Sequence, residues 1–266
     1  EYYNSIFNLY ADWGVDYIKA DDMMYPTYHR GEIEMMRRAI DQCGRPIVLS
    51  LSPGEAPLSQ AKHLEKHANM WRISRDFWDE WDKLLHTFDL LNAWSSYIQP
   101  NHWPDADMLP IGHISLGGRP HGPDRMSRLT WDEHYTLMTL WCITRSPLIM
   151  GGDLLTSPER SLSFLKNKEV IAVNQHSENN RQVYRDFQNN VTVWMADIPG
   201  SEDKYLALFN LGDEKKIVIF NFELEYMRDK YLIRDLWTRK DLGIFEKEFG
   251  VELAEHEAGL YRLKKQ

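Results

Sequence analysis

The hydrophobic pattern of this chain changes once, near residue 175, and that change constrains its fold more than any other feature. Before it, short apolar runs alternate with amphipathic segments of about ten to fifteen residues, which is typical of βα units around a parallel sheet. After it, alternating β-rich runs at 191–196, 205–210 and 216–220 are separated by turns and predict a small antiparallel β domain. We therefore expect an α/β part over residues 1–177 and a β domain over residues 178–266.

The first part predicts about five βα units. We expect strands at 15–21, 47–52, 69–73, 108–111 and 147–150, and helices at 30–42, 58–67, 76–88 and 131–144. A (β/α)8 TIM barrel has eight such units in about 250 residues, so this part corresponds to the last five units of a barrel. The chain begins with Glu1 and shows no signal-peptide pattern there, and we expect its true start to lie upstream.

Composition excludes several classes of function. The formal charge is −9, which disfavours nucleic acid as a partner, and no apolar run reaches the length of about 18 residues that a membrane span needs. The two cysteines, Cys43 and Cys142, are too few for a disulfide framework or a metal cluster, so we expect two reduced thiols in the core.

Charged residues follow three of the expected strands. Lys19 and Asp21 end the first, Arg72 and Asp76 follow the third, and Asp105 and Asp107 lie beside the fourth. Active sites of parallel barrels lie at the carboxyl ends of the strands, where a carboxylate can be a nucleophile, an acid, a metal ligand or only a helix cap. Five tryptophans lie among these residues and suggest a carbohydrate site, although each could instead pack in the core: Trp71, Trp78, Trp81, Trp94 and Trp103.

Several of these segments resemble one enzyme family. The stretch ADWGVDYIKAD at 11–21 resembles the nucleophile strand of glycoside hydrolase family 27, the α-galactosidase and α-N-acetylgalactosaminidase family. WRISRD at 71–76 resembles its acid/base segment, and WPDADML at 103–109 is similar to its Trp-Asn-Asp-Pro-Asp-Met-Leu motif. Segments 145–154 and 170–175 match the end of its barrel, and 234–237 with 256–260 resemble its C-terminal β-sandwich.

The resemblance implies a retaining exo-α-glycosidase that removes terminal α-linked galactose or N-acetylgalactosamine from an oligosaccharide or glycoconjugate. It implies Asp21 as the nucleophile and Asp76 as the acid and then the base of a double displacement. It also implies sugar contacts from Lys19, Ser52, Arg72, Asp107 and Met108. Neither a metal nor an organic cofactor is implied.

Departures from the family pattern leave alternatives open. Ser52 matches the serine of N-acetylgalactosaminidases, but Pro53-Gly54 matches neither subgroup, and Asp22 adds a carboxylate beside Asp21. No segment matches the aspartates that the family places on its first strands. A non-catalytic carbohydrate-binding relative, or the same mechanism on a β-L-arabinopyranoside or isomaltosyl unit, therefore stays open.

The missing family cysteines, with Met23 and Met24 after the nucleophile position, point to a bacterial protein. They leave open whether it is cytoplasmic, periplasmic or secreted, and whether it forms a homo-oligomer.

Two histidines have the spacing of a metal site. His63 and His67 are four residues apart on an expected helix, so their imidazoles lie on one face, but Glu65 is not placed as in His-Glu-x-x-His. We expect these histidines to form part of a solvated helix face.

Overall fold

The computed structural model describes residues 1–118 and 122–266, which divide into two compact units. The first unit comprises Glu1–Phe77 and Ser96–Asp107, and the second comprises Trp78–Ser95 and Met108–Gln266. This grouping by compactness places the last barrel helices with the β domain, and the expected domain boundary after residue 177 stays a prediction.

The first unit is built on a four-stranded parallel sheet. Its order along the sheet is the order along the chain: β1 (Tyr17–Ala20), β2 (Val48–Leu51), β3 (Met70–Arg72) and β4 (Trp103–Asp105). The register pairs Ala20 with Leu51, and Leu51 with Trp71. The carboxyl ends of β1 and β2 are therefore level, and the residues that follow them, Asp21 and Ser52, lie next to each other.

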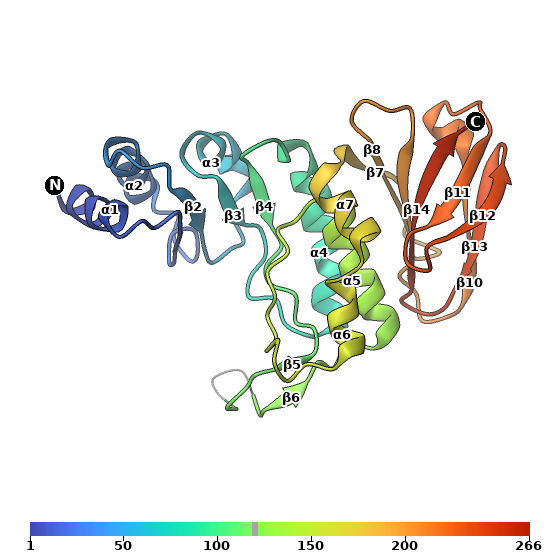
Figure 1. The fold of residues 1–266 in the computed structure, drawn as a ribbon, viewed down its shortest axis with the longest axis horizontal. Helices are drawn as coiled ribbons and strands as arrows, with labels where there is room; N and C mark the ends of the chain where they lie inside the picture. The colour runs from blue at the N-terminus through green and yellow to red at the C-terminus, as the bar shows by residue number, and fades with distance from the viewer. Residues whose placement is uncertain (119–121) are drawn as a thin grey trace. The chain divides into compact units, whose positions relative to one another are not determined.

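Helices connect these strands, as the alternating pattern predicts (Figure 1). α2 (Arg30–Gln42) lies between β1 and β2, and α3 (Ala61–His67), preceded by the 3-10 turn η1 (Leu58–Gln60), lies between β2 and β3; a further helix, α1 (Tyr2–Asp12), precedes β1. The bounds of α2 are those expected, because Ile33, Met36 and Ile40 form one buried stripe along it. α1 was not expected.

Three predicted elements are wrong in position. The helix expected at 76–88 is α4 (Trp81–Trp94), and residues 76–80 form bends and extended backbone before it. The fourth strand is β4 at 103–105, whereas 108–111, which contains Pro110, forms no strand. The run at 147–150 also forms no strand and makes a single parallel bridge, Leu109 to Met150.

The second unit begins with helices that cover a sheet. α5 (Trp131–Ile143) starts where expected, because Thr130 and Glu133 form a reciprocal capping box. It packs with α7 (Lys168–His176) and against strands β9 and β14 of the sheet below. The second unit also contains α6 (Glu159–Phe164) and the paired short strands β5 (His113–Ile114) and β6 (Arg125–Met126), whereas the 3-10 turn η2 (Ser95–Tyr97) follows α4 at the boundary between the two units in the chain.

The expected β domain is an antiparallel β-sandwich. Its larger sheet has the order β12 (Lys240–Phe245), β11 (Tyr231–Asp235), β14 (Ala258–Lys265), β9 (Lys204–Asn210), β8 (Val191–Asp197) and β7 (Glu178–Asp186). The smaller sheet pairs β10 (Lys216–Asn221) with β13 (Glu248–Leu253), and the 3-10 turn η3 (Phe222–Glu225) follows β10.

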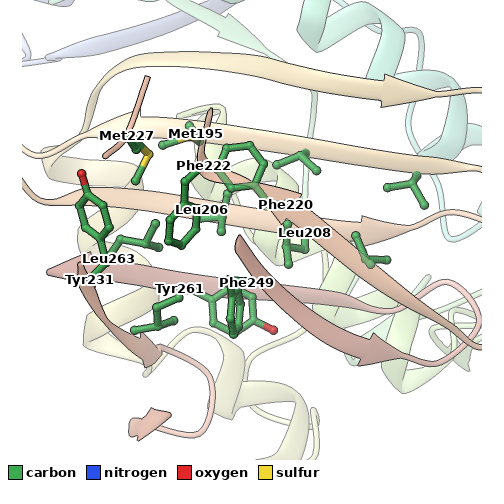
Figure 2. Packing of buried hydrophobic residues seen from close by; sticks show 14 of the residues in the cluster. Met195, Leu206, Leu208, Phe220, Phe222, Met227, Tyr231, Phe249, Tyr261 and Leu263 are labelled. Carbon is green, nitrogen blue, oxygen red and sulfur yellow. The ribbon is translucent and has the colours of Figure 1, made fainter. Parts of the chain in front are cut away.

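Two strands of the larger sheet, β8 and β9, are buried on both faces. Leu206 and Leu208 of β9 face Phe220, Phe222 and Phe249 across the sandwich (Figure 2). On the other face of β9, Phe209 packs edge-on against Phe88 of α4 with ring centroids 4.9 Å apart. This double burial explains why β8 and β9 read as continuous apolar runs although the sheet is antiparallel.

Candidate active site

Asp21 and Ser52 extend from the carboxyl ends of β1 and β2. Ser52 is buried, and its hydroxyl donates a hydrogen bond of 2.9 Å to Oδ1 of Asp21. The Asp21 carboxylate itself is exposed. The bond fixes the orientation of the carboxylate and leaves its second oxygen accessible to a reacting atom.

Arg72 joins two further carboxylates at the end of β3. Its side chain is only 5% exposed, and Nη2 lies 2.9 Å from Oδ2 of Asp107 and 3.4 Å from Oδ1 of Asp76. Asp76 is 67% exposed, so it is the more accessible of the two carboxylates. The buried guanidinium thus positions Asp76 at the rim, and the buried Asp107 carboxylate balances the charge of the guanidinium.

Arg72 and Asp76 do not meet on a helix. Residues 73–80, which lie between β3 and α4, form bends and irregular backbone. That backbone is held by Asp107, because the amide of Phe77 donates a 2.8 Å hydrogen bond to Oδ2 of Asp107. Ser74 also donates to the Ala106 carbonyl at 3.0 Å. The loop that carries Asp76 is therefore anchored to the segment after β4.

Asp107 lies in an unusual backbone conformation, with φ at 86°. Its amide donates a 2.9 Å hydrogen bond to Oδ1 of Asp105, which makes the turn after β4 an Asx-type turn. The turn directs the Asp107 carboxylate back toward Arg72, so strain at one residue is coupled to the position of the guanidinium.

Asp105 is a site residue to which the sequence alone assigned no role. It is fully buried, and this desolvation raises the pKa of its carboxyl to about 6. The Asp107 amide and the charges of Lys19 and Arg72 oppose that rise. The register that pairs Asp105 with Arg72 could have identified it, because it places an acid and a base side by side on adjacent strands.

The other two residues predicted to contact sugar, Lys19 and Met108, belong to different units. Lys19 lies on β1, exposed, and its charge acts on Asp105. Met108 belongs to the second unit, where its Sδ lies 2.5 Å from the position that a Cβ on Gly151 would take. Gly151 therefore allows the close approach of Met108, and a larger residue there would displace it.

Two of the five tryptophans are core residues. Trp71 is fully buried and Trp94 is 2% exposed, so neither can offer a ring face to a sugar. Trp81 stacks on His256 within the second unit, with ring centroids 3.7 Å apart. The expectation of an aromatic sugar platform is wrong for Trp71 and Trp94.

Comparison with known proteins identifies the family. The family model described as alpha galactosidase A matches residues 1–176. A second family model, described as the alpha galactosidase C-terminal beta sandwich domain, matches residues 188–263. The chain belongs to glycoside hydrolase family 27. The expected resemblance and the expected architecture, a partial parallel α/β barrel followed by an antiparallel sandwich, are thereby confirmed.

Relatives within the family differ in the substrates that their names give. A family 27 β-L-arabinopyranosidase from Geobacillus stearothermophilus is 44% identical, with a TM-score of 0.94 over 99% of this chain and 61% of that one. Alpha-galactosidase 2 of Arabidopsis thaliana is 27% identical over 96% of this chain and 61% of its own length. Mouse alpha-N-acetylgalactosaminidase is 30% identical over 62% of this chain and 39% of its own. The chain thus spans about three fifths or less of the length of each of these three relatives.

Proposed function

We propose that this protein is a retaining exo-acting glycosidase that releases terminal β-L-arabinopyranose. One observation carries the mechanism: two exposed rim carboxylates are held by different partners, Asp21 by the Ser52 hydroxyl and Asp76 by the Arg72 guanidinium. Two carboxyl groups of different environment are what a double displacement requires, one as a nucleophile and one as an acid.

In the first step, the Asp21 carboxylate attacks the anomeric carbon while Asp76 gives its proton to the departing glycosidic oxygen. The C–O bond to the aglycone breaks, and an ester bond from the sugar to Asp21 forms. Lys19 and Arg72 are available as cationic donors to sugar hydroxyls.

In the second step, Asp76 accepts a proton from a water molecule, and the oxygen of that water attacks the same anomeric carbon. The ester bond breaks, the sugar leaves with its original anomeric configuration, and Asp21 returns to a carboxylate. The hydrogen bond from Ser52 stabilises the leaving carboxylate as its charge returns.

The choice of β-L-arabinopyranose rests on the similarity to the Geobacillus enzyme. The sequence itself favoured α-galactose or α-N-acetylgalactosamine. β-L-arabinopyranose has the ring hydroxyl stereochemistry of α-D-galactose without the exocyclic hydroxymethyl group, so the same carboxylate pair serves both. The Ser52 hydroxyl is already engaged by Asp21, which weakens the argument that this serine is there to accommodate an acetamido group.

A substrate panel tests the proposal. The purified protein should hydrolyse p-nitrophenyl β-L-arabinopyranoside with a kcat/KM at least about tenfold above those for the α-galactoside and the α-N-acetylgalactosaminide, a difference of about 1.4 kcal/mol in transition-state binding. A preference for the α-galactoside would keep the mechanism and overturn the substrate. Binding of sugar with no hydrolysis of any of the three would favour the non-catalytic relative.

Two substitutions test the roles of the carboxylates. Asp21→Asn should lower kcat by roughly 10³-fold or more, and an activated 2-deoxy-2-fluoro glycoside should label Asp21 in the parent protein. Asp76→Asn should lower kcat by roughly 10²–10⁴-fold on substrates with poor leaving groups, and azide should restore turnover of the p-nitrophenyl glycoside by attacking the glycosyl ester. Equal loss on good and poor leaving groups, without azide rescue, would contradict the acid/base role.

A further inference from the structure

A second cluster of chemistry-bearing side chains lies on the helices of the first unit. His63 and His67 of α3 face Glu34 of α2. The expectation of a solvated helix face is wrong for His63, which is only 7% exposed, while Glu34 and His67 are half-buried. The cluster is therefore recessed but remains open to solvent on one side.

The three side chains approach each other closely enough to share one ion. One ligand atom from each lies within 4.8 Å of the others. Nε2 of His63 is 3.2 Å from Oε1 of Glu34, near the ~3.4 Å edge of a tetrahedron with ligand distances of about 2.1 Å. The two imidazole rings have centroids 4.5 Å apart and planes inclined at 39°.

A fourth residue orients the first histidine. The Tyr28 hydroxyl lies 2.6 Å from Nδ1 of His63. With Nε2 of His63 on a cation, the Nδ1–H would donate to the tyrosine oxygen. This is the outer contact that metal-ligating histidines commonly make.

The charges around the cluster are mixed. Arg30 competes for the carboxylate, but its Nη1 lies 3.9 Å from Glu34 and both side chains are substantially exposed. Such an ion pair contributes little in water, so a divalent cation can displace it.

We propose that Glu34, His63 and His67 bind one divalent transition-metal cation of the zinc class, with solvent completing its coordination. Two imidazole nitrogens and one carboxylate oxygen suit zinc, cobalt or nickel, whereas magnesium and calcium prefer oxygen ligands. The ion joins α2 to α3, two helices that lie on neighbouring βα units, and so stabilises the first unit by mass action. The site is separate from Asp21 and Asp76 and does not depend on the proposed glycosidase activity.

Calorimetric titration of the chelator-treated protein with Zn²⁺ tests this site. One equivalent should bind to the parent protein, and His67→Gln and Glu34→Gln should each weaken binding at least about tenfold. Both substituted residues are partly exposed, so folding should persist, which circular dichroism checks. His176→Gln, at an exposed position in the last turn of α7, removes a histidine outside the cluster and should leave the affinity unchanged.

Cobalt gives a spectroscopic test of the same residues. Co²⁺ should produce visible d–d absorption in the parent protein and in Asp21→Asn, and lose it in His67→Gln. Absence of stoichiometric binding, or equal affinity in the parent protein and both cluster variants, would overturn the proposal. Loss of glycosidase activity in Asp21→Asn with zinc binding retained would separate this site from the proposed active site.

Discussion

The parallel sheet and the β-sandwich have interiors of opposite character. The four-stranded parallel sheet ends in charged groups, with Arg72 and Asp105 buried on adjacent strands. The β-sandwich encloses an apolar cluster to which Leu208, Phe220 and Phe249 contribute (Figure 2). Arg72 Nε and Asp105 Oδ2 have no hydrogen-bond partner within the described residues. The first interior contains buried charged groups at a cost in stability, and the second contributes stability through apolar burial.

The largest effect should come from emptying the apolar interior. Phe220→Ala should lower the free energy of unfolding by roughly 3–5 kcal/mol, because a fully buried phenyl ring leaves a cavity between the sheets. Ile219→Ala, one residue earlier on β10 and 53% exposed, should change it by no more than about 0.5 kcal/mol. Urea denaturation of both variants measures this, and similar losses for the two would show that the sandwich is not the main source of stability.

Neutralising the charged interior should have a smaller effect, and it should raise the free energy of unfolding instead of lowering it. The pKa of Asp105 is raised to about 6, above its ordinary value of 3.8, so the folded state binds its proton more tightly than the unfolded state does. The contribution of the Asp105 carboxyl to the free energy of unfolding is fully present below about pH 4 and is lost as the pH rises through 6. Asp105→Asn should therefore match the parent near pH 3.5 and exceed it by up to about 3 kcal/mol at pH 7.

Urea unfolding of Asp105→Asn and the parent at both pH values measures the difference. The asparagine oxygen can still accept the Asp107 amide proton, so the turn after β4 is preserved. A variant less stable than the parent at pH 7 would show that Lys19 and Arg72 fully compensate the buried carboxylate.

The smallest effect concerns the helix that covers the sandwich. Thr130→Ala removes the hydroxyl that accepts a 3.2 Å hydrogen bond from the Glu133 amide. This should lower the free energy of unfolding by about 1 kcal/mol, which thermal unfolding measures. Thr130→Ser keeps the hydroxyl acceptor and should lower the free energy of unfolding by no more than a few tenths of 1 kcal/mol. Equal destabilisation by both would mean that the methyl group of Thr130, and not the cap, is what stabilises α5.

Local signals predicted much of the fold. The bounds of α2 follow from one amphipathic stripe, the start of α5 follows from its capping box, and β2 follows from a short buried apolar run. Each of these depends on residues within a few positions of one another, so the sequence contains the whole cause.

Elements that depend on distant partners were missed. α4 begins at Trp81 because the carboxylate of Asp79 is occupied by Arg125 and Arg128, which are more than forty residues away. Likewise, β4 precedes the apolar run at 108–111 because 103–105 pairs with β3. Neither partner can be inferred from the local pattern.

The candidate site shows the same division. The strand ends identified Asp21, Arg72 and Asp107 as rim residues, and the structure brings Arg72 and Asp107 into contact. The burial of Asp105 and the backbone φ of 86° at Asp107 arise from the register of β3 with β4. These features depend on tertiary contacts, so they cannot be inferred from the composition of the chain or the spacing of its residues.

The position of β1 at the margin of the parallel sheet has a practical consequence. β1 pairs with β2 on one side, and no described residue pairs with its other side. Every second residue along it is exposed, including Tyr17 at 43%. Its free amides and carbonyls form a template on which an extended segment of another molecule can add. Concentrated preparations of this polypeptide by itself will therefore tend to self-associate through this strand, and blocking that edge will improve their solubility.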